Sequence, residues 1–333
     1  MERLYTVSTK LAFALVAAVL AVQIYQAVTL PIGGGEAYLY DRFVRPTVRQ
    51  AMASELPNRD VLYGLLEKRS VGLFHVSPFS VRLPGVLFGV LYLWSWWQFA
   101  KLMLGSGWLF LGAVALTGAA ALRWGWFVRA DGVGTGLALE VCAVWLALRY
   151  LKWNHEVDLI NLNLAGACLG LSVAARLDFA IPAAALALAL LAVLGMQRQW
   201  TGWIDRVMIP AIVVALVFLV LPLSHAHATR EITPELTAGQ ARLLQSALQV
   251  LRSSAGPDPI RIGTIPAVEP VVNFYRAQQR ARAWERASRD FRSGPFDYYL
   301  LPAAEGNWAE QRHLLVLYRD ADFLLARSSY APM

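Results

Sequence analysis

Several stretches of this chain are apolar for long enough to cross a lipid bilayer, and they restrict the fold more than any other feature. A spanning helix needs about 17 to 25 predominantly apolar residues. Such runs cover residues 11–31, 83–104, 108–122 (a short one), 132–151 and 207–224. The run 159–196 is too long for one span and is interrupted by Arg176 and Asp178, so we expect two spans joined by a tight turn. The sequence therefore predicts a mainly α-helical, polytopic membrane protein with about seven transmembrane helices.

The composition agrees with a membrane protein and excludes an ordinary soluble one. Apolar residues make up 57% of the chain, charged residues make up 16%, and the mean hydropathy is +0.45. The first run is too long for the apolar region of a signal peptide, so we expect it to stay attached as a helix. Nucleic acid is not expected as a partner of a chain with this many spans.

Charged and amide residues return after Ser224, which predicts a change of domain. We expect a transmembrane domain over residues 1–227 and a small soluble α/β domain over 228–333. In the second domain, Thr233 and Pro234 are typical of the start of a helix. The segments "PIRIGTI", "FDYYLLP", "HLLVLYRD" and "DFLLARS" predict strands of a mixed sheet, and "EPVVNFYRAQQ" predicts a helix between the first two.

The distribution of Lys and Arg favours a cytoplasmic amino terminus, because Arg3 and Lys10 precede the first run. The segment 32–82, here called the outer loop, then lies outside although it is rich in cations. These are Arg42, Arg45, Arg49, Arg59, Lys68, Arg69 and Arg82. Either the protein is inverted, or these cations bind something anionic, and we favour the second explanation. Seven spans would place the C-terminal domain on the same extracytoplasmic face.

The outer loop begins with "GGGEAYLYDR", residues 33–42, directly after the first apolar run. Its glycines would let the backbone leave the helix at angles that other residues rarely adopt. The rest of the loop forms two amphipathic stretches that suit the membrane interface, where most of the cations would only reach toward headgroups. Most of the cations are Arg, whose planar fork fits phosphate better than Lys does.

The order of these motifs resembles the GT-C superfamily of membrane glycosyltransferases, and most closely its protein mannosyltransferase and lipid A aminoarabinose transferase branch. The resemblance covers most of residues 10–200. It rests on the glycine-rich exit with "AYLYDRFV", on "LYGLL", "SPFSVRLPGVLFGVLYL" and "WFVRADGVGTGLALE", and on "LAGACLGLSVAARLDFAIPAA". It implies a transferase in the cytoplasmic (inner) membrane that passes a sugar from a polyprenyl-phosphate donor to an extracytoplasmic lipid, glycan or protein acceptor. It names no certain cofactor and leaves a divalent metal open.

The resemblance also implies site residues. The family's leading aspartate corresponds to Gly35 here, so Glu36 is the first choice for the base that deprotonates the acceptor, with Asp41 and Asp60 of the same loop as alternatives. Asp131 is the second catalytic carboxylate, expected to share an outer cleft with Glu36. The residues expected to bind substrate are Tyr38, Asp41, Arg42, Asp60, Arg82, Arg129 and Arg176.

Structural roles remain as alternatives for three of these residues. Glu36 would also suit the cap of the following helix, and Asp131 would suit the N-cap of the helix that begins beside it. Arg176 would form a local ion pair with Asp178. Because Gly35 cannot accept a proton, a non-catalytic relative that binds lipid or a protein partner is the alternative function.

Other chemistries have little support in the sequence. Cys142 and Cys168 lie in expected spans and predict neither a disulfide framework nor a zinc site. His225 and His227 are typical of a linker rather than a metal pair. The glycines of "GVGTG" follow no strand, so they favour close helix packing over nucleotide binding. Glu140, inside an expected span, is a functional candidate because ionisable groups are costly there.

Overall fold

The computed structural model of the chain describes residues 2–47, 61–153, 159–196, 207–214, 236–256, 258–279, 281 and 283–329. The described residues divide into two compact units. Unit 1 comprises residues 1–29, 49–70 and 79–229, and unit 2 comprises residues 30–48, 71–78 and 230–333. The expected domain boundary at residue 227 lies outside the described residues, and so does most of the expected span 207–224, of which 207–214 are helical.

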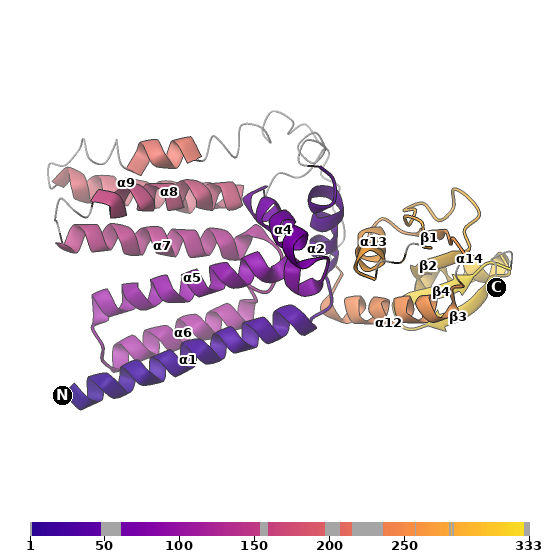
Figure 1. The fold of residues 1–333 in the computed structure, drawn as a ribbon, viewed down its shortest axis with the longest axis horizontal. Helices are drawn as coiled ribbons and strands as arrows, with labels where there is room; N and C mark the ends of the chain where they lie inside the picture. Colours follow the sequence, from indigo (N-terminus) through magenta and orange to yellow (C-terminus); the bar gives the residue numbers. More distant parts are fainter. Residues whose placement is uncertain are drawn as a thin grey trace. The chain divides into compact units, whose positions relative to one another are not determined.

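Unit 1 is built of long apolar helices that run alongside one another (Figure 1). They are α1 (Glu2–Thr29), α5 (Pro78–Leu104), α6 (Trp108–Trp124), α7 (Gly132–Trp153), α8 (Leu159–Ala175) and α9 (Ala180–Met196). Within these helices the segments Val7–Thr29, Pro78–Leu104 and Gly132–Lys152 are long and apolar enough to cross a membrane. The segments Trp108–Trp124, Ile160–Ala175 and Leu177–Leu190 are apolar but shorter.

The expected turn in the run 159–196 is present, because the short 3-10 helix η3 (Leu177–Phe179) separates α8 from α9. The second expected span begins earlier than the sequence suggested, since α5 starts at Pro78 and includes Pro84 in its interior. The helix α4 (Val61–Phe74) occupies the later part of the outer loop.

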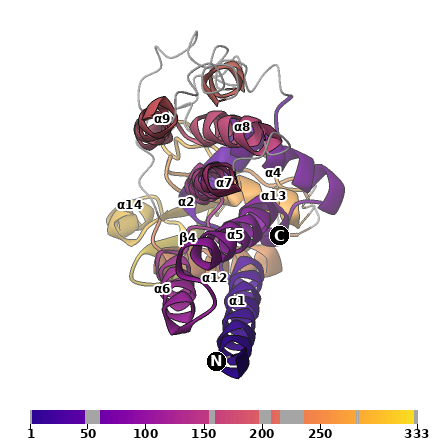
Figure 2. The same ribbon diagram turned by 90° about the vertical axis from the view of Figure 1, so that its left-hand side faces the viewer.

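Buried side chains join the helices of unit 1 into a packed bundle, seen end-on in Figure 2. Val19 of α1, Tyr92 of α5, Ala121 of α6 and Ala138 of α7 belong to one apolar cluster. A second cluster joins α7, α8 and α9.

Two glycines of α7 permit the close approach of Trp126, in the turn before this helix, and of Phe179 in η3. A Cβ added at Gly134 would overlap the carbonyl oxygen of Trp126, and one added at Gly136 would come within 2.5 Å of the Phe179 ring. Neither position therefore tolerates a larger residue without movement of its neighbours.

In unit 2, the short helices α2 (Gly34–Leu39) and η1 (Tyr40–Val44, a π-helix) contact α13 (Glu269–Gln278). The sheet contains β1 (Ile262–Thr264), β2 (Tyr298–Pro302), β3 (Leu315–Arg319) and β4 (Phe323–Arg327), in the order β1-β2-β4-β3. Strand β1 pairs with β2 in parallel, and β4 pairs antiparallel with both β2 and β3. The prediction of four strands in a mixed sheet, with a helix between the first two, is confirmed.

The helix α12 (Ala238–Ser254) packs on β4 and β3 through an apolar face. Its buried residues Ala241, Leu244, Leu248 and Leu251 recur at helical spacing. Its N-cap is Thr237, whose hydroxyl accepts a hydrogen bond from the Gln240 amide N–H at 3.2 Å. The expected cap at Thr233 is therefore wrong for this helix, and Thr233 itself lies outside the described residues. Two further short helices, η5 (Ala303–Glu305) and α14 (Gly306–Gln311), follow β2.

Candidate functional site

The predicted base Glu36 lies in the first turn of α2, where its side chain is buried and serves as a helix cap. Its Oε2 accepts a hydrogen bond from the Gly33 amide N–H at 2.8 Å. This is one half of a capping box, because glycine has no side chain to return the bond. The structural alternative for Glu36 is thus observed, and any part that it plays in proton transfer must accommodate this bond.

The glycines before Glu36 do not bend the backbone in the way the sequence suggested. Gly33 has φ −77° and ψ 162°, which most residues adopt, and Gly34 and Gly35 are helical. None of the three has a positive φ. The chain therefore leaves α1 by ordinary extended backbone at Gly33 and enters α2 directly.

Asp131 belongs to unit 1 and precedes α7. Its Oδ1 accepts a hydrogen bond from the Val133 amide N–H at 3.1 Å, which is the geometry of an N-cap. Arg129, two residues earlier, is exposed. Glu36 belongs to unit 2 and Asp131 belongs to unit 1, so the cleft that they were expected to share remains a prediction.

Two other predicted residues of unit 1, Arg176 and Arg82, form hydrogen bonds within that unit. The Nε of Arg176 donates to Asp178 Oδ2 at 2.8 Å, so the expected alternative ion pair is present. Arg82 is 3% exposed, and its Nη1 donates to the Ala27 carbonyl oxygen at 3.3 Å, which ties α5 to the end of α1. Asp60 lies outside the described residues.

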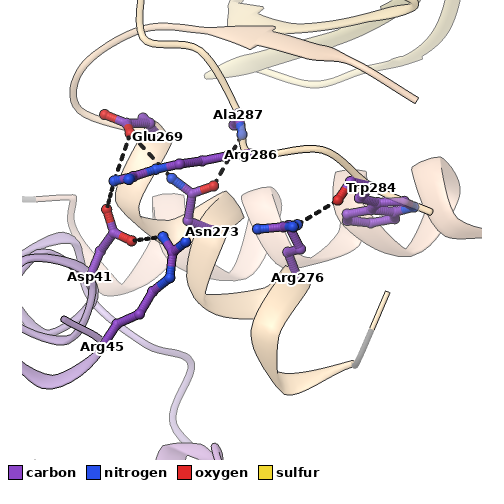
Figure 3. Close-up of polar contacts among 8 residues, drawn as sticks. All are labelled: Asp41, Arg45, Glu269, Asn273, Arg276, Trp284, Arg286 and Ala287. Carbon is purple, nitrogen blue, oxygen red and sulfur yellow. Dashed lines mark hydrogen bonds and ion pairs between the residues drawn. The ribbon is translucent and has the colours of Figure 1, made fainter. Parts of the chain in front are cut away.

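Asp41, one of the predicted substrate-binding residues, forms two ion pairs. Its side chain is 1% exposed and lies between two arginines, as Figure 3 shows. Arg45 Nη1 donates to Asp41 Oδ1 at 3.0 Å, and Arg286 Nη2 donates to Asp41 Oδ2 at 2.5 Å. A buried carboxylate needs charged partners, and the two arginines supply them. The bond from Arg286 also joins the C-terminal segment to the start of the outer loop.

Glu269 in the first turn of α13 lies beside this pair. Its Oε1 accepts a hydrogen bond from Asn273 Nδ2 at 3.2 Å and is 3.7 Å from Arg286 Nη2. Asn273 Oδ1 in turn accepts from the Ala287 amide N–H at 3.1 Å, which fixes the segment that carries Arg286. Burial, and then the negative charge of Asp41, raise the pKa of Glu269 above its ordinary value, although Arg286, Arg42 and Arg289 oppose the rise.

Arg276 of α13 adds a further positive charge. Its Nε donates to the Trp284 carbonyl oxygen at 2.5 Å. Burial lowers the pKa of Arg276, and the positive charges of Arg45 and Arg286 lower it further. We call Arg42, Arg45, Arg276, Arg286 and Arg289 the arginine cluster.

Aromatic contacts hold the two segments of the site together. The ring of Tyr40 meets that of Phe274 edge to face, with 5.2 Å between centroids. Arg42 lies over the ring of Tyr38, with its Cζ 5.8 Å from the centroid. Tyr38 therefore helps to position an arginine, and its expected contact with substrate remains a prediction.

Within the described ranges, His, Cys, Asp and Glu side chains do not gather in any group of three or more that would hold a metal ion. Cys142 in α7 is buried, Cys168 in α8 is half-buried, and neither forms a disulfide bond. Glu140 is 8% exposed, and its Oε1 has no hydrogen-bond partner among the described residues.

Sequence reasoning missed most of the site. Arg45 is four residues after Asp41, the spacing of a helical ion pair, so this signal was present. Glu269, Asn273, Arg276, Arg286 and Arg289 have no local pattern that distinguishes them from other surface residues of the C-terminal segment.

No protein-family model, no curated protein and no solved structure matches the chain.

Proposed function

We propose that the protein is a membrane glycosyltransferase that passes a sugar from a polyprenyl-phosphate donor to an extracytoplasmic acceptor, as its resemblance to GT-C enzymes implies. In this proposal the chain crosses the cytoplasmic membrane about seven times, and the C-terminal domain lies outside. The acceptor class and the sugar are left open. Membrane lipid surrounds the helices, and in the described part of the chain three of them are long and apolar enough to cross a bilayer.

The observation that carries the proposal is the arginine cluster, which contains two arginines from the start of the outer loop and three from the C-terminal segment. Residues 30–33 alone connect α1, which contains the first membrane-crossing segment, to α2. The five arginines of the cluster are accompanied by three carboxylates, those of Asp41, Glu269 and Glu285, so positive charge is in excess. A cluster of this kind, a few residues from a membrane-crossing helix, suits the phosphate of a lipid-linked donor.

The transfer step needs a base and a stabilised leaving group. The acceptor oxygen would attack the anomeric carbon while the bond from that carbon to the phosphate oxygen breaks, and the phosphate would keep the electron pair. The acceptor proton would pass to a carboxylate, for which Glu36 remains the first choice. Arginines would stabilise the charge that develops on the departing phosphate.

Purified full-length protein in nanodiscs tests the proposal with polyprenyl-phosphate donors that carry labelled hexoses or pentoses. Glu36→Gln keeps an oxygen that accepts the Gly33 N–H, and Asp131→Asn keeps an N-cap acceptor, so each variant removes charge without removing the cap. We expect sugar release by the wild type and a loss of about 10²- to 10⁴-fold in Glu36→Gln. Release that is unchanged in Glu36→Gln would remove Glu36 from the mechanism.

A second function, lipid or partner binding without catalysis, is favoured by one specific observation. Both predicted catalytic carboxylates serve as helix caps, and the family's leading aspartate is replaced by Gly35, which is exposed. The absence of sugar release from every donor by the wild type, together with retained lipid binding, would establish this second function instead.

A further inference from the structure

The arginine cluster contains more hydrogen-bond donors than its known bonds use. Asp41 engages Arg45 through one oxygen and Arg286 through the other. Each guanidinium carries five N–H groups, so these two bonds use a small part of the donors of either arginine. The side chains of Arg45 and Arg286 are 41% and 45% exposed, so their remaining donors are accessible to a ligand from solvent.

The like charges in the cluster are held close together at a cost. Arg276 is partly buried, and its charged form is disfavoured by burial and by Arg45 and Arg286. The carboxylates of Asp41 and Glu269 offset only part of this charge, and the environment of Glu269 favours its neutral form. A protein that holds arginines in this arrangement is stabilised when an anion binds among them, because the anion reduces their mutual repulsion.

We infer that Arg276, Arg286 and Arg289 of the C-terminal segment join Arg42 and Arg45 of the outer loop to bind one phosphate monoester. The inference rests on the proposed function and extends it, because it assigns part of the site for the released polyprenyl phosphate, the monoester that leaves in the transfer step, to the C-terminal domain. A monoester dianion matches the excess of positive charge, and its oxygens match the paired N–H groups of guanidinium.

The fold explains how the two segments are held ready for the ligand. Tyr40 packs on Phe274, and Asn273 bonds the backbone at Ala287 beside Arg286. Asp41 then holds Arg45 and Arg286 on either side of one carboxylate, as Figure 3 shows. The arginines are therefore positioned before a ligand arrives, which lowers the entropic cost of binding.

The phosphate could belong to a lipid or be free in solution, and three probes separate these sources. Binding to the full-length protein in nanodiscs is measured with farnesyl phosphate, inorganic phosphate and farnesol. We expect farnesyl phosphate to bind and farnesol to bind at least about tenfold more weakly. If inorganic phosphate binds as tightly as farnesyl phosphate, the site recognises the free ion; if farnesol binds as tightly, the phosphate is not recognised and the inference is wrong.

The variant Arg42→Gln/Arg289→Gln removes two charges from the cluster and leaves both ion pairs of Asp41 in place. We expect its affinity for farnesyl phosphate to fall roughly 10- to 100-fold. The matched control is Arg242→Gln/Arg252→Gln, which removes two exposed charges from α12 in the same unit. Equal affinities of wild type, variant and control would overturn the inference.

Hydrogen exchange on the wild type provides a test that does not depend on how any variant folds. Farnesyl phosphate should slow exchange in both segments of the site, residues 36–45 and 269–289. Protection confined to the helices of unit 1, or restricted to residues 36–45, would contradict a role for the C-terminal segment.

Failure of this inference is distinguishable from failure of the proposed function. Phosphate-dependent binding without sugar release would support the site and contradict the transferase. Sugar release that is unaffected in Arg42→Gln/Arg289→Gln would support the transferase and contradict the site.

Discussion

Arg286 donates a hydrogen bond at 2.5 Å to Asp41, a residue 245 positions earlier in the chain, and this bond joins the C-terminal segment to the start of the outer loop. Both oxygens of Asp41 are paired with arginines, although the carboxylate itself is almost inaccessible. The C-terminal segment is therefore part of the same compact unit as residues 30–48.

Asp41→Asn should loosen this unit. The amide keeps one acceptor oxygen but loses the charge, so the bonds to Arg45 and Arg286 weaken. Since both arginines are partly exposed, water offsets some of the loss, and we expect a local destabilisation of about 1–3 kcal/mol. Faster hydrogen exchange over residues 269–278 measures the effect, with the exposed Asp258→Asn as control. Equal exchange in the two variants would show that the ion pairs contribute nothing.

The raised pKa of Glu269 makes the stability of unit 2 depend on pH. The folded state holds the Glu269 proton more tightly than the unfolded state, whose pKa is near the ordinary 4.5. The ionised carboxylate thus costs stability above the folded pKa, and this cost disappears as the pH falls toward 4.5. The Glu269 carboxyl group accepts a hydrogen bond from Asn273. The charged groups that act on it are Asp41, Arg42, Arg286 and Arg289.

Glu269→Gln should remove this pH dependence while it keeps the acceptor for Asn273. The difference in apparent melting temperature between variant and wild type should favour the variant at high pH and shrink as the pH falls. A difference that is constant with pH would show that Glu269 does not titrate in this way.

The close contact of Gly134 with Trp126 predicts that Gly134→Ala destabilises unit 1. A methyl group there would overlap a backbone oxygen, and we expect a cost of about 1–3 kcal/mol. Gly112→Ala is the matched control, because Gly112 lies in the interior of α6 with nothing within 4 Å of an added Cβ. That control should gain roughly 0.5–1 kcal/mol from lower backbone entropy. Opposite shifts in apparent melting temperature would support the packing, and equal shifts would contradict it.

The capping box at the start of α12 gives a prediction that concerns only the C-terminal sheet domain. Thr237→Ala removes the hydroxyl that accepts the Gln240 N–H, at an expected cost of about 1 kcal/mol. Thr237→Ser keeps the hydroxyl and should stay close to wild type. Hydrogen exchange over residues 238–244 measures both, and similar exchange in Ala and Ser variants would show that the cap is energetically silent.

Local sequence patterns were sufficient for most helices and strands. Strand β2 follows from a short continuous apolar run, and helix α13 follows from apolar residues at helical spacing, and both patterns are local. The N-cap of α12 was misplaced although Thr237 and Gln240 have the spacing of a capping box. Here the signal was present, and Thr233 with Pro234 competed with it.

The site was much harder to predict than the fold. The Asp41–Arg286 bond depends on tertiary packing between distant segments, and no spacing rule connects two such residues. The capping roles of Glu36 and Asp131 depend on neighbours two or three residues away, so sequence reasoning identified them as alternatives. Long-range polar contacts therefore account for most of what was missed.

The central claim is that arginines from both the outer loop and the C-terminal segment bind one phosphate. The most direct measurement is the affinity of the full-length protein for farnesyl phosphate in two single variants, Arg42→Gln and Arg289→Gln, each from one segment. We predict that both variants bind more weakly than the wild type and than Arg252→Gln. Weaker binding in Arg42→Gln alone, with Arg289→Gln equal to the wild type, would contradict the claim.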